Sequence, residues 1–134
     1  MVVLKYSTGS NFTTLSTRMG ASLDQDFVTT CISVEEQLRG WAALLNQTRD
    51  RQRLVNAYHE LNKLVDYFAC WKRLEFDELA AEKFDQLRSQ KIRIGTMDLR
   101  IAAIALVNNA TLLTANLRDF QQVPNLQAED WLTP

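Results

Sequence analysis

The sequence predicts one α/β domain built on a parallel sheet, and two observations lead to this prediction. Short β-branched or apolar runs, typical of buried strands, alternate with longer segments whose apolar residues recur every three or four positions, as in helices. The chain has 134 residues, 46% of them hydrophobic, which is enough for one buried core. We therefore expect residues 1–134 to form a single domain with helices on both faces of the sheet.

The expected elements follow from these local patterns. Strands are predicted at residues 27–32, 74–76 and 111–114, with an edge segment at 126–131. Helices are predicted over residues 34–45, 51–71, 79–87 and 97–108, with a short helical turn at 116–120. The two long helices in the first half of the chain are expected to form a hairpin.

The N-terminal residues are expected to form a broken helix. Leu15 and Met19 keep helical spacing, and residues 6–10 would form the break. Val3 and Leu4, followed by Lys5, fit such a helix better than a buried strand. This interpretation leaves the sheet without a strand from the beginning of the chain.

Composition excludes several classes of protein. The net charge of −1 and the pI near 5.8 give no global basic surface for nucleic acid, so an RNA partner would need a local basic patch. The longest apolar runs, such as 101–107, are too short to cross a bilayer. The N-terminus has no signal-peptide pattern, and a cytoplasmic protein is expected.

Three acids stand where a parallel sheet places its ligands. Glu36 follows the strand at 27–32, Asp98 opens the helix at 97–108, and Asp119 follows the strand at 111–114. Ligands of parallel α/β sheets gather at the carboxyl ends of the strands. Clustered carboxylates without histidine or thiolate partners suit Mg²⁺ or Mn²⁺, and Thr114 and Asn116 could orient a ligand or water. Such an ion can activate water for phosphodiester hydrolysis.

Each acid also has a purely structural interpretation. Glu36 could complete a capping box with Ser33, and Asp98 could favour the positive end of a helix. Asp119 could be a solvated turn residue. The nearby basic residues could hold RNA phosphates, although a solvated face would look the same in the sequence; they are Arg88, Lys91, Arg93, Arg100 and Arg118.

Three segments of the sequence resemble the VapC-type toxins, which are PIN-domain endoribonucleases. The first two segments are IGTMDLRIAA at 94–103 and LTANLRDFQQVPNL at 113–126, and a closing EDW follows at 129–131. A further segment, SVEEQLRG at 33–40, is similar to the second acidic motif of this family, in which a glutamate precedes a glycine by four positions. That spacing selects Glu36 over Glu35.

The resemblance implies a function and a set of site residues. Glu36, Asp98 and Asp119 would hold Mg²⁺ or Mn²⁺ and catalyse RNA hydrolysis, with Thr114 and Asn116 as supporting polar groups. The resemblance also implies an antitoxin protein as partner. Arg93, Arg100 and Arg118 are the candidate contacts to RNA, because they lie near the candidate acids in the sequence.

One feature of the family is absent from the sequence. Family members begin with an apolar strand that ends in an aspartate of an LDT-type motif, whereas residues 1–6 contain no acid. Two explanations compete: Lys5 stands at the place of the acid, or the first strand and its aspartate are missing through a shifted start. The second is preferred here, and the activity of the chain is then expected to be impaired. A missing central strand would expose sheet edges and favour a homodimer or higher oligomer.

A rival interpretation assigns no catalysis to the chain. In it the acids serve as helix caps, and the hairpin binds an antitoxin-like partner or a second copy. The apolar residues expected on that surface are Trp41, Leu44, Leu45, Leu64 and Phe68.

Overall fold

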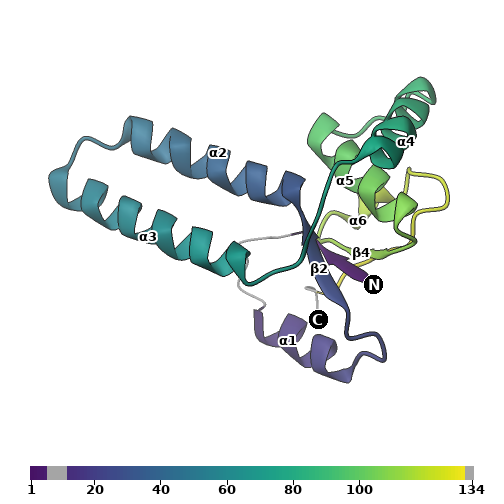
Figure 1. The fold of residues 1–134 in the computed structure, drawn as a ribbon, viewed down its shortest axis with the longest axis horizontal. Coiled ribbons are helices and arrows are strands. Elements are labelled where there is room, and N and C mark those ends of the chain that lie inside the picture. Colours follow the sequence, from purple (N-terminus) through teal and green to yellow (C-terminus); the bar gives the residue numbers. More distant parts are fainter. Residues whose placement is uncertain (6–11, 132–134) are drawn as a thin grey trace.

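A five-stranded parallel sheet forms the centre of the protein. The computed structural model describes residues 1–5 and 12–131 (Figure 1), and the sheet has the strand order β3-β2-β1-β4-β5. Its strands are β1 (Val2–Leu4), β2 (Phe27–Thr30), β3 (Arg73–Leu74), β4 (Thr111–Leu113) and β5 (Ala128–Glu129). Helices flank the sheet, so the predicted α/β class is confirmed. Among the helices of the described ranges, none is both long and apolar enough to cross a membrane.

The central strand is β1, and this corrects the expectation of a missing strand. Val2 and Val3 are buried, and β1 pairs with β2 on one side and with β4 on the other. The sheet therefore has no gap at its centre and no exposed strand edges next to such a gap. Exposed edges were the reason to expect oligomers, and the structure removes that reason. Helical spacing does hold further along, where α1 (Phe12–Ala21) contains Leu15 and Met19. The expected break at residues 6–10 lies outside the described residues.

The two long helices form a hairpin that extends away from the sheet, as predicted (Figure 1). They are α2 (Cys31–Gln47) and α3 (Arg51–Ala69). The cap of α2 differs from expectation, because β2 ends at Thr30 and the helix begins at once. The Thr30 hydroxyl accepts from the backbone N–H of Ser33 at 3.1 Å, so Thr30 is the N-cap and Ser33 lies inside the first turn.

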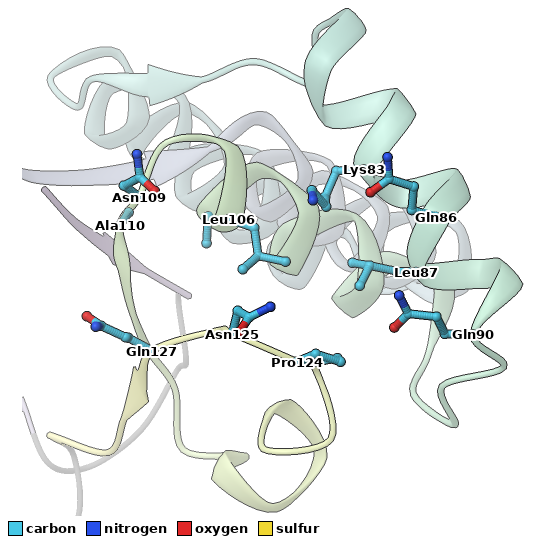
Figure 2. Close-up of a pocket in the computed structure, with 11 residues that line it drawn as sticks. Lys83, Gln86, Leu87, Gln90, Leu106, Asn109, Ala110, Pro124, Asn125 and Gln127 are labelled. Carbon is cyan, nitrogen blue, oxygen red and sulfur yellow. The ribbon is translucent and has the colours of Figure 1, made fainter.

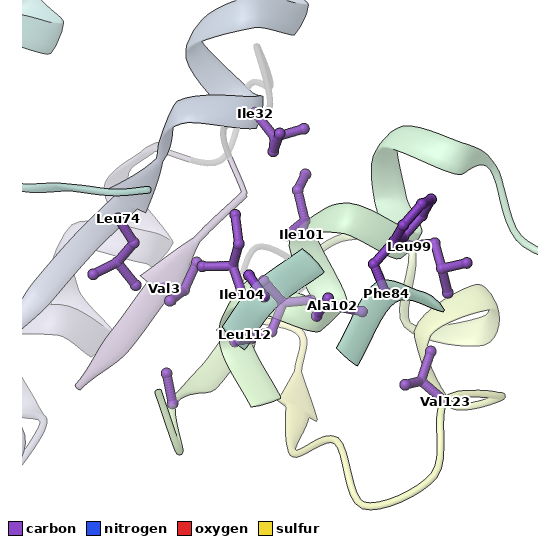
Figure 3. Close-up of a cluster of buried hydrophobic side chains, with 14 of the residues drawn as sticks. Val3, Ile32, Leu74, Phe84, Leu99, Ile101, Ala102, Ile104, Leu112 and Val123 are labelled. Carbon is purple, nitrogen blue, oxygen red and sulfur yellow. The ribbon is translucent and has the colours of Figure 1, made fainter. Parts of the chain in front are cut away.

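The apolar core lies between the sheet and two packed helices, α4 (Glu78–Ser89) and α5 (Thr96–Val107) (Figure 3). The expected Asp77 cap of α4 is present, because its carboxylate accepts from the Ala80 N–H at 2.9 Å. Gly95 instead of Thr96 is the N-cap of α5, without a side-chain hydrogen bond. Residues 101–105 of α5 are all buried, which explains why this segment is apolar on every side. The short α6 (Leu117–Phe120) follows β4 and buries Phe120.

Candidate functional site

Lys5, Glu36 and Asp98 meet at the carboxyl edge of the sheet. Lys5 directly follows β1, and its backbone N–H donates to the Leu113 carbonyl at 3.1 Å, which continues the pairing with β4. Its ammonium Nζ lies 2.7 Å from Oδ1 of Asp98, in the first turn of α5. The position after the central strand, where the family resemblance requires an aspartate, is therefore held by a cation.

The Lys5–Asp98 ion pair is largely shielded from water. The side chains of Lys5 and Asp98 are only 20% and 17% exposed. The ammonium also lies 5.3 Å from the centroid of the Phe120 ring, within the range of a cation–π interaction. Shielding strengthens the attraction between the two charges, and it also makes the loss of either charge costly.

Glu36 lies near this pair, and one of its carboxylate oxygens has no hydrogen-bond partner among the residues that the structure describes. Its Oε1 is buried. The expected capping box with Ser33 is not formed, because the Ser33 backbone N–H donates to the Thr30 hydroxyl instead. Burial raises the pKa of Glu36 above its usual range, while the Lys5 charge opposes this rise and the Asp98 charge adds to it. The structural explanation of Glu36 as a cap is therefore wrong, and its burial has no compensating hydrogen bond at Oε1.

Replacing Glu36 with glutamine is expected to stabilise the fold modestly at neutral pH. A carboxyl whose pKa is raised on folding contributes stability below the usual glutamate pKa, and this contribution is lost as pH rises through the folded value. Glu36→Gln removes this loss and one buried, unpartnered anion. We expect a gain of up to about 1 kcal/mol in the free energy of unfolding at pH 7, measured by urea denaturation.

The neighbouring Glu35 supplies the matched control. Glu35 pairs with Arg39 at 2.7 Å on the solvent side of α2, with the two side chains 37% and 70% exposed. Glu35→Gln should cost about 0.3–0.5 kcal/mol, the usual value of a surface pair within a helix. A loss of stability in Glu36→Gln at pH 7, or a gain that does not shrink in acid, would contradict the assigned cause.

The structure places Asp119, Asn116 and Thr114 in a local network at the end of β4. The Asn116 side-chain amide donates to Oδ2 of Asp119 at 2.8 Å. The Asn116 backbone N–H donates to the hydroxyl of the buried Thr114 at 3.0 Å. Thr114 and Asn116 thus hold the turn that contains Asp119 in place. The residue of α6 that lies near the Lys5 ammonium is Phe120.

The three candidate RNA contacts differ in their surroundings. Arg93 and Arg118 are exposed, whereas Arg100 is partly buried. The Arg100 guanidinium lies 5.5 Å from the centroid of the Phe84 ring and contacts the sulfur of Met97 at 3.6 Å. Arg100 therefore contributes to the packing of α5, while Arg93 and Arg118 present their side chains to solvent.

The side chains present do not fit a Mg²⁺ or Mn²⁺ ion. Across residues 1–5 and 12–131, no group of three side chains from His, Cys, Asp and Glu could hold a metal ion. The donor set explains this, because one ammonium faces the two carboxylates of Glu36 and Asp98 and already neutralises part of their charge. Hard divalent ions depend on ligand number and charge for their affinity.

A cavity lies at the opposite edge of the sheet and is separate from these residues. It has a volume of about 330 Å³ and lies at the amino ends of β4 and β5, beside α4 and the end of α5 (Figure 2). Side-chain amides and Lys83 contribute to its lining; the amides are Gln86, Gln90, Asn109, Asn125 and Gln127. None of the sequence-predicted site residues lines it.

Lys5 is the site residue whose position the preferred sequence interpretation missed. Its assignment to a helix removed it from the carboxyl edge of the sheet. The signal was the run Val2-Val3-Leu4, whose β-branched residues favour a strand. With that strand, Lys5 follows at the place of the family's aspartate, which was the alternative interpretation.

Part of the chain is similar in sequence to VapC ribonucleases. No family model matches the chain. It is 44% identical over 46 residues to Ribonuclease VapC2 of Rickettsia felis, a stretch that is 34% of each protein. It is 36% identical over 62 residues to the tRNA(fMet)-specific endonuclease VapC of Salmonella typhimurium, which is 43% of this chain and 47% of the relative. The matched stretch thus spans about a third to a half of these relatives.

Solved structures match the fold along its whole length. The VapBC-1 structure from nontypeable Haemophilus influenzae has a TM-score of 0.68 at 23% identity, with 99% of this chain and 100% of that chain covered. FitAcB from Neisseria gonorrhoeae has a TM-score of 0.69 at 20% identity and covers 98% of both chains. The chain therefore resembles VapC-type PIN-domain proteins, in its fold along the whole length and in its sequence over about a third of the chain.

Proposed function

We propose that this chain is a VapC-type endoribonuclease domain of a toxin–antitoxin pair, with RNA as its substrate class and with impaired hydrolysis. The observation that carries the proposal is the meeting of Glu36 and Asp98 at the carboxyl edge of the sheet, with Lys5 between the end of β1 and Asp98. The two acids support a site for phosphodiester chemistry. The cation explains why that site should perform poorly.

The proposed reaction is hydrolysis of a phosphodiester bond, assisted in intact family members by Mg²⁺ or Mn²⁺. We assign no step of that reaction to the chain as it stands, because its side chains do not fit the ion. Arg93 and Arg118 are exposed and could contact RNA phosphates, which fits the need for a local basic patch in an acidic protein.

The proposed partner is a small antitoxin protein. Several solved structures with this fold are VapBC complexes. In this chain the α2–α3 hairpin exposes large apolar side chains, including Leu44, Val55, Tyr58 and Val65, which are 45–56% exposed. An exposed apolar surface of this kind is typical of a protein interface. Phe68, expected on this surface, is instead buried at the base of the hairpin.

If a small protein is encoded beside this chain, co-expression of the two tests this partnership. We expect the two to elute together in size-exclusion chromatography. The double variant Tyr58→Glu/Val65→Glu places two charges seven residues apart on one face of α3 and should weaken the complex by at least about 30-fold, the effect of losing one interface hot spot.

Leu79 provides the control for this variant. It is 62% exposed on α4, outside the hairpin, so Leu79→Glu should leave the affinity unchanged. Isothermal titration calorimetry measures the affinity of the wild type and of both variants for the antitoxin. If the hairpin variant binds as tightly as the wild type, the hairpin is not the antitoxin surface, and if no complex forms at all the proposed pairing is wrong.

An RNA cleavage assay with Mn²⁺ tests the impairment. VapC1 of Haemophilus influenzae, a ribonuclease by name and 47% identical over 45 residues, is a suitable reference. We expect cleavage by this chain to be at least about 100-fold slower, because losing a group that only orients a metal ligand already costs roughly 10–100-fold, and here a ligand itself is replaced.

A further inference from the structure

We propose that Lys5 is a built-in cation that takes the place of the divalent ion, so that this site holds its carboxylates together without metal. The inference concerns the same residues as the proposed function. It rests on that function only in naming Mg²⁺ or Mn²⁺ as the ions that the site would otherwise take. One substitution, Lys5→Asp, should then convert the site into a metal site.

The backbone fixes where the ammonium lies. Lys5 follows the central strand and keeps its hydrogen bond to Leu113 at 3.1 Å, so it cannot shift along the sheet without breaking the register with β4. On the other side of β1, the Thr29 hydroxyl donates to the Leu4 carbonyl at 3.3 Å. Both neighbouring strands thus hold the end of β1, from which the Lys5 side chain reaches Asp98.

The contacts of the ammonium resemble those of a counter-ion in a closed site. It lies 2.7 Å from the Asp98 carboxylate and 5.3 Å from the Phe120 ring centroid, and its charge opposes the rise that burial causes in the pKa of Glu36. An aromatic ring offers the electron-rich face that an ammonium prefers, but it offers a Mg²⁺ or Mn²⁺ ion no oxygen ligand. The surroundings of this position therefore suit an ammonium better than a hard divalent ion.

The charges lead to the same conclusion. A divalent ion placed beside Lys5 would be repelled by the ammonium and would find Asp98 already engaged. With aspartate at position 5, three carboxylates would converge on one edge of the sheet. Without a cation those carboxylates would repel one another, so the Lys5→Asp chain should depend on metal for its stability.

Mn²⁺ binding to the full chain is the direct test. Electron paramagnetic resonance and calorimetry measure it. The wild type is expected to bind with a Kd above about 10 mM, and Lys5→Asp at least about 100-fold more tightly, as expected when a missing ligand is supplied to a metal site. The melting temperature of Lys5→Asp should rise with Mn²⁺, whereas that of the wild type should not. Lys5→Asp/Asp98→Asn should lose the gained binding.

Two results would overturn the inference. One is wild-type binding of Mn²⁺ below 1 mM that Asp98→Asn abolishes, on the order of a real carboxylate site. The other is a folded Lys5→Asp chain that binds Mn²⁺ no better than the wild type. If Lys5→Asp stays unfolded even with Mn²⁺, Lys5→Ser removes the ammonium without adding charge, and it must bind Mn²⁺ more tightly than the wild type for the inference to stand.

RNA cleavage separates this inference from the proposed function. If Lys5→Asp binds Mn²⁺ but cleaves no RNA, the inference on Lys5 holds and the proposed reaction is wrong. If the wild type cleaves RNA with Mn²⁺ and needs Asp98 to do so, the proposed reaction holds and Lys5 does not replace the ion.

Discussion

Replacing Phe120 with alanine is expected to lower the free energy of unfolding by about 3–5 kcal/mol, the usual cost of deleting a buried aromatic ring. Phe120 is fully buried and belongs to the main core cluster, although it lies in a helix of only four residues. A helix of this length has little stability of its own. The packing of the Phe120 ring must therefore hold α6 in place. Urea denaturation followed by circular dichroism measures the change.

The loss should be a large fraction of the total, since domains of this size are stable by only about 5–15 kcal/mol. Leu79→Ala serves as the control, because Leu79 is 62% exposed and its truncation should cost less than about 0.5 kcal/mol. Phe120→Ala should also remove the aromatic face near Lys5. A measured cost below about 1 kcal/mol would mean that α6 does not depend on this ring.

The elements that the sequence predicts correctly are those whose signal is local. The apolar stripes of the α2–α3 hairpin repeat at helical intervals, and α5 contains a continuous apolar run, so the positions of these helices follow from neighbours in the chain. The Asp77 cap is equally local, because its partner is the Ala80 N–H. Such patterns can be recognised without any knowledge of the fold.

The features that the sequence does not settle depend on distant partners. Val2–Leu4 is a three-residue run, too short to separate strand from helix by periodicity, and only its pairing with β2 and β4 makes it a strand. The α2 cap moves from Ser33 to Thr30 because β2 ends at Thr30, two residues earlier than expected. The ion pair of Lys5 with Asp98 joins opposite ends of the sequence, so only the folded sheet brings these residues together.

Replacing Lys5 with methionine is expected to destabilise the fold by about 2–3 kcal/mol, less than the 3–5 kcal/mol typical of fully buried pairs because both partners retain some exposure. Methionine keeps much of the length and apolar surface of lysine, so the change removes chiefly the charge. Asp98 then loses its partner, and Glu36 faces a second carboxylate without the ammonium. The free energy of unfolding, again from urea denaturation, measures the cost.

A surface lysine provides the matched control for this charge deletion. Lys63 pairs with Glu60 at 3.4 Å on α3, with the two side chains 62% and 47% exposed. Lys63→Met should therefore change stability by less than about 0.5 kcal/mol, because solvent screens the pair. Equal effects of the two methionine variants would mean that Lys5 acts as an ordinary surface lysine.

A double-mutant cycle then separates the ion pair from simple packing. Replacing a buried ion pair entirely with apolar groups is often neutral, whereas removing one partner leaves a buried charge. Lys5→Met/Asp98→Leu should therefore recover at least about half of the stability that Lys5→Met loses, which gives a coupling energy of 1 kcal/mol or more. If the two changes are additive, Asp98 does not hold the ammonium. The stability lost in Lys5→Met would then come from packing. The proposal that Lys5 takes the place of a divalent ion would be wrong.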